Sequence, residues 1–185
     1  MKDIINIVCD EGATSRVVIG SVEENFESLL PGGTPRIIIV TDAKVHANNL
    51  AFVNAHEHIV IGQGESSKTF VKLEEVYRQL LHMGADRSTF IVGMGGGIVT
   101  DVTGFVASTY MRGVRFGFLP TTLLAQVDAS IGGKNGVNFE GYKNMVGTFN
   151  QPDFVLCDLS LLQTLPEREF RAGLAEIVKA GLIAD

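Results

Sequence analysis

The chain has 185 residues, of which 45% are hydrophobic and 19% charged, a composition that supports a folded core rather than a disordered segment. Its formal net charge of −6 offers no general attraction for nucleic acid or for an anionic membrane surface. The N-terminus lacks the apolar run of a signal peptide, and no stretch approaches the ~18 uninterrupted apolar residues of a membrane span. We therefore expect a cytoplasmic protein with neither nucleic-acid nor membrane partners.

Short β-branched runs alternate with amphipathic stretches along most of the chain. This alternation is typical of parallel β-α-β units, so we expect an α/β, Rossmann-like fold with a mostly parallel sheet flanked by helices. In chain order, the predicted strands are Ile4–Val8, Val17–Ile19, Arg36–Thr41, His58–Ile61, Thr89–Val92, Arg115–Leu119 and Phe154–Cys157.

Two stretches between these strands predict helices that cover the sheet. Ser21–Leu30 opens with Ser21 and Glu24 at the spacing of a capping box. The second helix, Ser67–Met83, would place one apolar face on the sheet, formed by Phe70, Leu73, Tyr77, Leu80 and Leu81.

The pattern changes after Leu165 to a single long helical stretch, Pro166–Ala184, in which Pro166 suits a first helical position. We therefore predict a domain boundary near Ser160. Residues 1–160 would form the α/β domain, and residues 161–185 the first helix of a helical domain that is otherwise largely absent.

A glycine-rich turn, GMGGGIVTD at 93–101, follows an apolar strand and leads into a helix. Glycines there allow a sharp turn and a close approach to a ligand, and the helix N-terminus would favour a pyrophosphate. Tight packing of helix on sheet would also explain them. The turn departs from the common GxGxxG fingerprint, because Ile98 stands at its sixth position. Asp101 follows among apolar residues and needs a partner, such as a ribose hydroxyl, a cation or an amide.

Charged residues are sparse between positions 116 and 150. Asp128 and Lys134 interrupt a run that looks buried, so they are candidates for a task in a cleft. Lys134 could instead be a solvent-facing loop lysine. Lys143 and Asn144 add a cation and an amide, whereas Glu140 is expected to be a loop acid.

Two further ionisable pairs have both a functional and a surface interpretation. Lys68, placed in a helix's first turn, opposes the helix dipole unless Glu65 or a nucleotide phosphate compensates it. In the last helix, Glu176 and Lys179 lie three residues apart on one face. Each pair could be a plain surface ion pair, and Glu176 could instead bind a metal.

The cysteines and histidines form no recognisable metal or disulfide pattern. Cys9 and Cys157 lie far apart and are expected to be small core residues. We expect His56 and His58 to be a solvated pair.

Six ordered motifs resemble the 3-dehydroquinate synthase family between Val40 and Asp185. Thr100 and Asn135 depart from the commoner family pattern, which has glycine and threonine there. The motifs are VTDAKV, GQGESSK, GGGIVTDVTGFVASTYMRG, PTTLLAQVDASIGGKNGVN, GYKNMVGTFNQP and GLAEIVKAGLIAD.

The resemblance implies a role for most of the residues already singled out. NAD would be bound by Asp42, Glu65, Lys68, Gly95, Gly96, Gly97, Asp101, Thr121 and Thr122. A sugar-acid phosphate would contact Asp128, Lys134, Lys143, Asn144, Lys179 and Arg112, the last across a homodimer interface. Glu176 resembles one of three ligands to Zn²⁺ (or Co²⁺), and the other two would be histidines of a following helical domain.

The implied activity is that of a phosphorus–oxygen lyase in the shikimate pathway, which leads to chorismate and the aromatic amino acids. NAD would oxidise a hydroxyl of 3-deoxy-arabino-heptulosonate 7-phosphate, phosphate would leave by β-elimination, and NADH would reduce the ketone before ring opening and aldol closure give 3-dehydroquinate. The alternatives are a related sugar-phosphate cyclase, a metal-dependent polyol dehydrogenase, or a non-catalytic NAD-binding module. We expect this chain to be the NAD-binding part and inactive alone.

Overall fold

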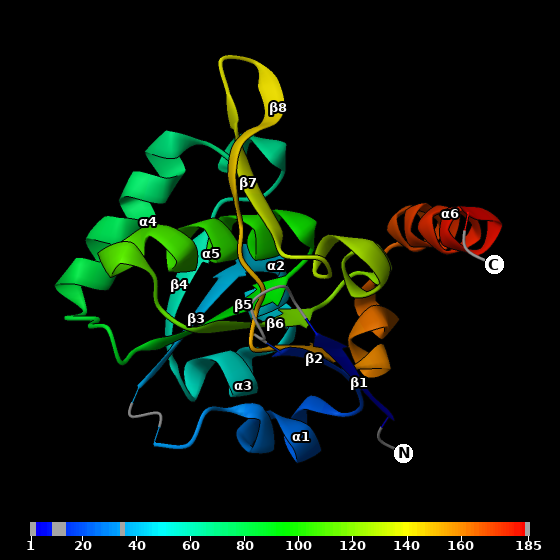
Figure 1. Ribbon diagram of the computed structural model, residues 1–185, viewed down its shortest axis with the longest axis horizontal. Coiled ribbons are helices and arrows are strands. Elements are labelled where there is room, and N and C mark those ends of the chain that lie inside the picture. The colour runs from blue at the N-terminus through cyan, green and yellow to red at the C-terminus, as the bar shows by residue number, and fades with distance from the viewer. Residues whose placement is uncertain (1–2, 9–13, 34–35, 184–185) are drawn as a thin grey trace.

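The computed structural model describes residues 3–8, 14–33 and 36–183, and its centre is a seven-stranded sheet with the strand order β1-β2-β9-β6-β5-β3-β4 (Figure 1). β1 and β2 are antiparallel, and every other neighbouring pair is parallel. The mostly parallel α/β fold is therefore confirmed. The strands of this sheet are β1 (Asp3–Val8), β2 (Thr14–Ile19), β3 (Ile37–Asp42), β4 (Glu57–Ile61), β5 (Phe90–Gly95), β6 (Phe116–Pro120) and β9 (Phe154–Cys157).

Helices cover both faces of the sheet, α1 and α3 on one side and α4 and α5 on the other (Figure 1). Alternate side chains of the five inner strands enter two separate cores: Ile38 and Val40 of β3 join the core under α4 and α5, whereas Ile39 joins the core under α1 and α3. Burial on both faces explains the nearly continuous apolar runs of these strands. These helices are α1 (Val22–Leu29), α2 (Ala43–Asn48), α3 (Leu50–Asn54), α4 (Phe70–His82) and α5 (Gly97–Thr109).

The strand order changes direction between β3 and β5. From β3 the chain first forms β4 on one side and then returns to form β5 on the other side of β3. At the carboxyl ends, the Thr41 hydroxyl donates to the Met94 carbonyl (2.8 Å), and the Thr121 amide donates to the Gly95 carbonyl (2.9 Å). Open α/β sheets bind ligands at such a switch point.

A β-hairpin that the sequence did not predict rises above the helices on the α5 side (Figure 1). Its strands are β7 (Lys134–Phe139) and β8 (Tyr142–Phe149), with a register shift between Val137 and Phe139. Glu140 and Gly141 form its turn with positive φ values of 48° and 81°. The expectation that Glu140 is a loop acid is therefore confirmed.

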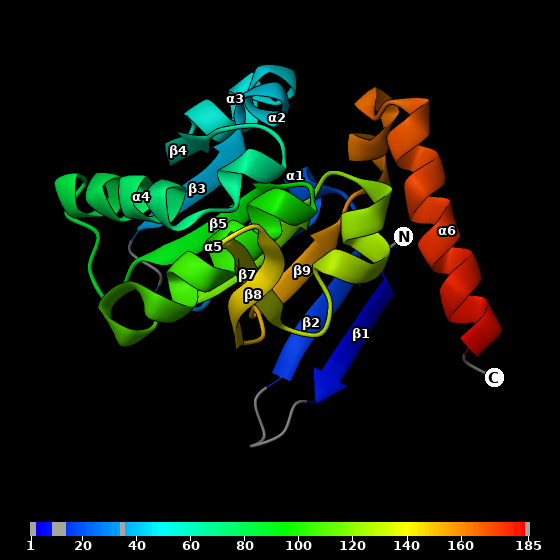
Figure 2. The same ribbon diagram turned by 90° about the horizontal axis from the view of Figure 1, so that it is seen from above.

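The C-terminal helix α6 (Glu167–Ile183) lies to the side of the sheet, next to a π-helical turn, η4 (Ala125–Ala129) (Figure 2). It begins one residue after Pro166, and Ala184 lies outside the described residues. Among the residues that the structure describes, no helix is long and apolar enough to cross a membrane. Short 3₁₀ segments complete the fold: η2 (Glu65–Ser67), η3 (Tyr110–Arg112) and η5 (Leu159–Thr164).

One predicted helix start and one predicted capping box are wrong. The first helix begins as expected, with Ser21 as its N-cap. The side chain of Ser21 caps no amide of α1; the Val22 amide instead donates to Asp158 Oδ2 (2.8 Å), from a residue distant in sequence. The second helix begins at Phe70 rather than Ser67, because the Thr69 hydroxyl accepts from the Lys72 amide (3.4 Å) as its N-cap. Lys68 therefore precedes α4, and the helix-dipole argument for it was wrong. Of the predicted apolar face, Leu73 and Leu80 are buried, whereas Phe70 and Leu81 are exposed.

The predictions for cysteine and histidine had mixed outcomes. Cys157 is buried, and burial raises the pKa of its thiol to about 11, as suits a core residue, whereas Cys9 lies outside the described residues. His56 and His58 are half-buried rather than solvated. His58 packs against His46, with ring centroids 4.9 Å apart, and each Nδ1 of His56 and His58 bonds a backbone carbonyl.

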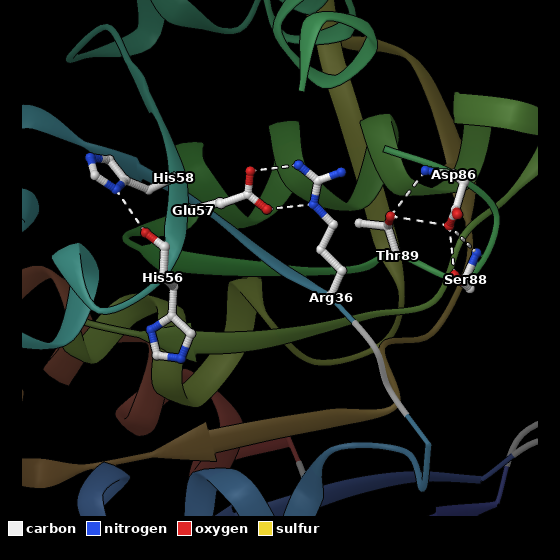
Figure 3. Close-up of polar contacts among 7 residues, drawn as sticks. All are labelled: Arg36, His56, Glu57, His58, Asp86, Ser88 and Thr89. Atoms are coloured by element: carbon white, nitrogen blue, oxygen red, sulfur yellow. Dashed lines mark hydrogen bonds and ion pairs between the residues drawn. The ribbon is translucent and has the colours of Figure 1, made fainter. Parts of the chain in front are cut away.

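Polar contacts fasten the amino-terminal ends of β3, β4 and β5 (Figure 3). Arg36 donates to both carboxylate oxygens of Glu57, which lowers the pKa of Glu57. The Asp86 carboxylate accepts from the Ser88 amide (2.8 Å) and hydroxyl (2.6 Å), and so shapes the turn into β5. These contacts lie at the opposite ends of the strands from the switch point and serve the fold.

Gly104 of α5 provides a test of how the hairpin packs on the helix. A Cβ at Gly104 would lie 1.8 Å from Oδ1 of Asn135, and Asn135 is held in place by donating to the Gly133 and Asn150 carbonyls. We expect Gly104→Ala to lower the free energy of unfolding by about 2 kcal/mol because of overpacking.

The matched control is Gly181→Ala in α6, where an added Cβ meets nothing within 4 Å. It should raise the free energy of unfolding by about 0.5 kcal/mol through helix propensity alone. Urea denaturation measures both changes. Equal effects of the two substitutions would contradict the packing described for Gly104.

Candidate nucleotide-binding site

A cleft of about 510 Å³ opens at the carboxyl ends of β3 and β5, where the strand order changes direction. This volume lies within the ~300–1,000 Å³ usual for small-molecule and cofactor sites. The cleft contains eight of the nine residues predicted to bind NAD: Asp42, Glu65, Lys68, Gly96, Gly97, Asp101, Thr121 and Thr122. The ninth, Gly95, ends β5 directly beneath it.

The glycine turn forms the floor of the cleft. Gly96 is the N-cap of α5 and contributes no side chain, and Thr100 makes the first bond of the helix by donating to the Gly96 carbonyl (3.1 Å). The preceding amides of the first turn have no acceptor within the helix. A Cβ at Gly96 would lie 3.0 Å from Thr122, and one at Gly97 would lie 3.2 Å from Ala129, both on the cleft wall. The turn therefore presents backbone donors where side chains would obstruct a ligand.

Asp42 ends β3 and caps α2 at the rim of the cleft. One carboxylate oxygen, Oδ1, accepts from the amides of Lys44 (2.9 Å) and Val45 (3.0 Å). These bonds fix the direction of the carboxylate, and its second oxygen can accept from a ligand hydroxyl. Asp42 therefore lines the same cleft as Gly96 and Gly97 of the glycine turn.

Lys68 is buried, with 4% of the residue exposed, so its interpretation as half of a surface pair with Glu65 was wrong. Its ammonium donates to Asp101 Oδ2 (2.5 Å) and to Asn144 Oδ1 (2.5 Å). Burial raises the pKa of Asp101, partly offset by Lys68, and the nearby carboxylates of Glu65 and Asp128 raise it further. An ammonium has three donors, so one remains for a ligand in the cleft.

The residues predicted to contact substrate do not line this cleft, and Asp128, Lys134 and Lys143 are exposed rather than buried. Asn144 does not line the cleft, but its side chain accepts a hydrogen bond from Lys68, which does. Lys179 forms an ion pair with Glu176, and its hydrogen bond to Glu176 together with the nearby Asp128 carboxylate raises the pKa of Lys179. The residues predicted to contact substrate thus lie in η4, in the hairpin and on α6 rather than at the glycine turn.

Arg112 lies at the C-terminal end of α5, whereas the cleft lies at its N-terminal end. A 13-residue helix is about 20 Å long, so within one chain Arg112 is remote from the glycine turn. Arg112 and Met111 both have positive φ values, 69° and 50°.

Several cleft residues were missed from the sequence. They lie in and directly after α2, in η5 and in the first turn of α6, where the change of pattern was interpreted only as a domain boundary. The missed residues that line the cleft include Lys44, Asn48, Asn49, Leu161, Thr164 and Glu169. Asn138, also missed, bonds Glu65 from the hairpin (2.7 Å). The sequence did offer one signal for Asn138, because this residue belongs to the motif GGKNGVN.

A glycine turn, an acid at the end of the neighbouring strand and a cleft at the switch point define an α/β protein of the nucleotide-binding class. Residues 58–172 match the family described as 3-dehydroquinate synthase N-terminal. The chain belongs to this family. It is 54% identical to the 3-dehydroquinate synthase of Dictyoglomus thermophilum over 125 residues, which is 68% of this chain and 35% of that relative.

Two solved structures resemble the fold. One is 2-deoxy-scyllo-inosose synthase complexed with carbaglucose-6-phosphate, NAD⁺ and Co²⁺ (TM-score 0.86, 28% identity, 96% of this chain and 51% of that chain). The other is 2-epi-5-epi-valiolone synthase from Streptomyces hygroscopicus with NAD⁺ and Zn²⁺ (TM-score 0.75, 33% identity, 89% of this chain and 48% of that chain). The chain therefore spans about half, or less, of the length of these proteins.

Lys68→Met tests the buried ion pair at the cleft. The substitution leaves the Asp101 carboxylate beside Glu65 and Asp128 without a cation, so we expect the free energy of unfolding to fall by about 3 kcal/mol near pH 7. An acid whose pKa is higher in the folded than in the unfolded state destabilises the fold increasingly as pH rises. Without Lys68 the pKa of Asp101 rises further, so the loss should shrink as pH falls towards about 5.

Lys72→Met is the control, because Lys72 forms an exposed pair with Glu75. It should change the free energy of unfolding by no more than about 0.5 kcal/mol. Urea denaturation at both pH values measures the two variants. A loss for Lys68→Met that does not depend on pH would contradict the role given to Asp101.

Proposed function

We propose that the chain binds NAD in the cleft at the glycine turn and forms the cofactor-binding part of a 3-dehydroquinate synthase. The observation that carries this proposal is the meeting of Asp42, the open N-terminus of α5 and Thr121–Thr122 in one cleft at the switch point. The solved relatives with NAD⁺ and a divalent metal support it. The proposed substrate is 3-deoxy-arabino-heptulosonate 7-phosphate, in the biosynthesis of aromatic amino acids.

The first turn of α5 is the proposed pyrophosphate site. Its free amides and the positive end of the helix dipole attract an anion without a basic side chain. The absence of a Cβ at Gly96 and Gly97 lets the backbone come within hydrogen-bonding distance. The residues of the cleft thus fit the group that the family resemblance implies.

Asp42 would accept a hydrogen bond from a ribose hydroxyl of the nucleotide. Its capped carboxylate is already oriented by the amides of Lys44 and Val45. A carboxylate at this place favours NAD over NADP, because a 2′-phosphate would be repelled by it.

The substrate would lie between the cleft, the hairpin and α6, where Lys134, Lys143 and Lys179 bring cations to its carboxylate and phosphate. Arg112 would reach the phosphate of substrate held by a second copy of the chain in a homodimer. Bound NAD would take up hydride from a secondary alcohol carbon and return it in the same turnover, so no NADH accumulates.

Glu176 remains our proposal for a ligand of Zn²⁺ or Co²⁺. Within residues 3–8, 14–33 and 36–183, no group of three histidine, cysteine, aspartate or glutamate side chains could hold a metal ion. Because a catalytic zinc site needs about three protein ligands, these residues do not make up a metal site by themselves. Glu176 would contribute one ligand to such a site.

The proposal for NAD is tested by isothermal calorimetry on the chain. We expect saturable 1:1 binding of NAD, weakened by about 100-fold in Gly97→Val, because the added side chain stands over the helix N-terminus. Gly32→Val is the control, since an added Cβ at Gly32 meets nothing within 4 Å and lies outside the cleft. A wild-type chain without affinity for NAD, or equal affinity in Gly97→Val with an unchanged melting temperature, would contradict the proposal.

The catalytic part is tested by Lys134→Glu in the full-length protein. We expect phosphate release from the heptulosonate phosphate to slow by about 100-fold, because a cation facing an anionic substrate becomes a repelling carboxylate. Phosphate and NADH are both measured. Unchanged turnover and substrate affinity would remove Lys134 from the site.

The same assay separates the alternatives. Phosphate release without net NADH supports a cyclase, and identification of the product distinguishes 3-dehydroquinate from the product of a related sugar-phosphate cyclase. Net NADH with a polyol supports a dehydrogenase. NAD binding without turnover supports a non-catalytic module.

A further inference from the structure

Asn138, in the first strand of the hairpin β7–β8, makes two hydrogen bonds to the segment that borders the cleft and one to the second strand of the hairpin. Its Nδ2 donates to Glu65 Oε1 (2.7 Å), its Oδ1 accepts from the Asn144 amide (2.9 Å), and its backbone amide donates to the Lys68 carbonyl (2.8 Å). Asn138 does not itself line the cleft, whereas Glu65 and Lys68 do. One half-buried residue therefore contacts both the second strand of the hairpin and the segment that borders the proposed nucleotide.

These bonds close a ring. Glu65 and Lys68 belong to one turn, in which the Lys68 amide donates to the Glu65 carbonyl (3.1 Å). From Lys68 the ring continues through the ammonium to Asn144 Oδ1, and from the Asn144 amide to Asn138 and back to Glu65. Because a carboxylate only accepts, the carboxamide of Asn138 has a single workable orientation, with Nδ2 towards Glu65.

The backbone of Asn144 is shaped for this ring. Asn144 has a φ of 53°, in the left-handed region that asparagine tolerates better than most side chains. The neighbouring irregularity between Val137 and Phe139 leaves Asn138 opposite the Asn144 amide rather than in regular strand pairing. Loss of the Asn138 acceptor would free the Asn144 backbone amide, and with it the backbone that carries the Asn144 side chain and the adjacent Lys143.

We propose that Asn138 is a positioning residue that holds Lys143 and Asn144 of the hairpin in a fixed place relative to Glu65 and Lys68 of the cleft. This inference rests on the proposed function. Asn138 acts through Glu65 on the nucleotide side and through Asn144 on the substrate side, so the two halves of the site form together.

The test measures NAD affinity by calorimetry in Asn138→Ala and Asn138→Asp across a range of pH. Asn138→Ala should weaken NAD binding by about 10-fold relative to wild type at every pH. Asn138→Asp keeps the acceptor for the Asn144 amide but places two carboxylates together. The NAD affinity of Asn138→Asp should be lowest near pH 7.5. It should recover towards the wild-type affinity as the pH falls to about 5.5, where one proton shared by the two carboxylates restores the donor to Glu65.

A second variant exchanges donor and acceptor. In Asn138→Asp with Glu65→Gln, the new amide can donate to the new carboxylate, so the hydrogen bond returns with reversed polarity. We expect the double variant to bind NAD more tightly than the summed effects of Asn138→Asp and Glu65→Gln would give. Its NAD affinity should not rise as the pH falls, because no carboxylate pair remains to share a proton. This rescue distinguishes a positioning role from a general loss of stability.

Asn150→Ala is the matched control, because Asn150 stands at the base of the same hairpin, and its side chain donates to Ser108 Oγ (3.0 Å) away from the cleft. Its NAD affinity should equal that of wild type. Equal affinity in all these proteins, equal weakening by Asn150→Ala, or no recovery of Asn138→Asp at low pH would overturn the inference alone. Failure of the wild-type chain to bind NAD would overturn the proposed function and this inference with it.

Discussion

The ammonium of Lys68 lies between the carboxylate of Asp101 and the side-chain oxygen of Asn144, almost out of contact with water. A buried cation is tolerated only with partners of this kind. These three residues come from the segment before α4, from the first turns of α5 and from the hairpin. Their mutual attraction therefore fixes where the glycine turn, the cleft rim and the hairpin stand relative to one another.

The structure of the cleft also explains how a chain with a negative net charge would attract a phosphate-containing ligand. The net charge of −6 provides no basic surface, and the charge of Lys68 is already matched by Asp101. Attraction for a pyrophosphate would come mainly from the backbone amides at the start of α5, which glycine at positions 96 and 97 leaves uncovered, with Lys44 as a cation on the cleft wall. The cations of the hairpin and of α6 remain for the substrate, so the two ligands would be bound by different chemical means.

The glycine turn could be located from the sequence because a strand, a glycine run and a helix are adjacent in the chain. Asp42, Thr121 and Thr122 were indicated only by the family resemblance. The hairpin was missed because residues 134–149 show no regular apolar alternation, its strands being held partly by polar contacts such as those of Asn138. The capping box predicted at the start of α1 is absent because the Val22 amide bonds Asp158, far along the chain. Local patterns do not contain such partners, and the burial of Lys68 by Asp101 and Asn144 was hidden for the same reason.

We propose that the cofactor lies on the N-terminus of α5, and that its binding also affects Asn144 of the hairpin through the hydrogen bond from Lys68. An NMR titration of the ¹⁵N-labelled chain with NAD tests it most directly. The account predicts the largest shifts at the amides of Gly96, Gly97 and Val99, with smaller ones at Asn144, and none at Glu57 or Asp86 at the opposite ends of the strands. Shifts confined to other regions, or an unperturbed glycine turn at saturating NAD, would contradict it.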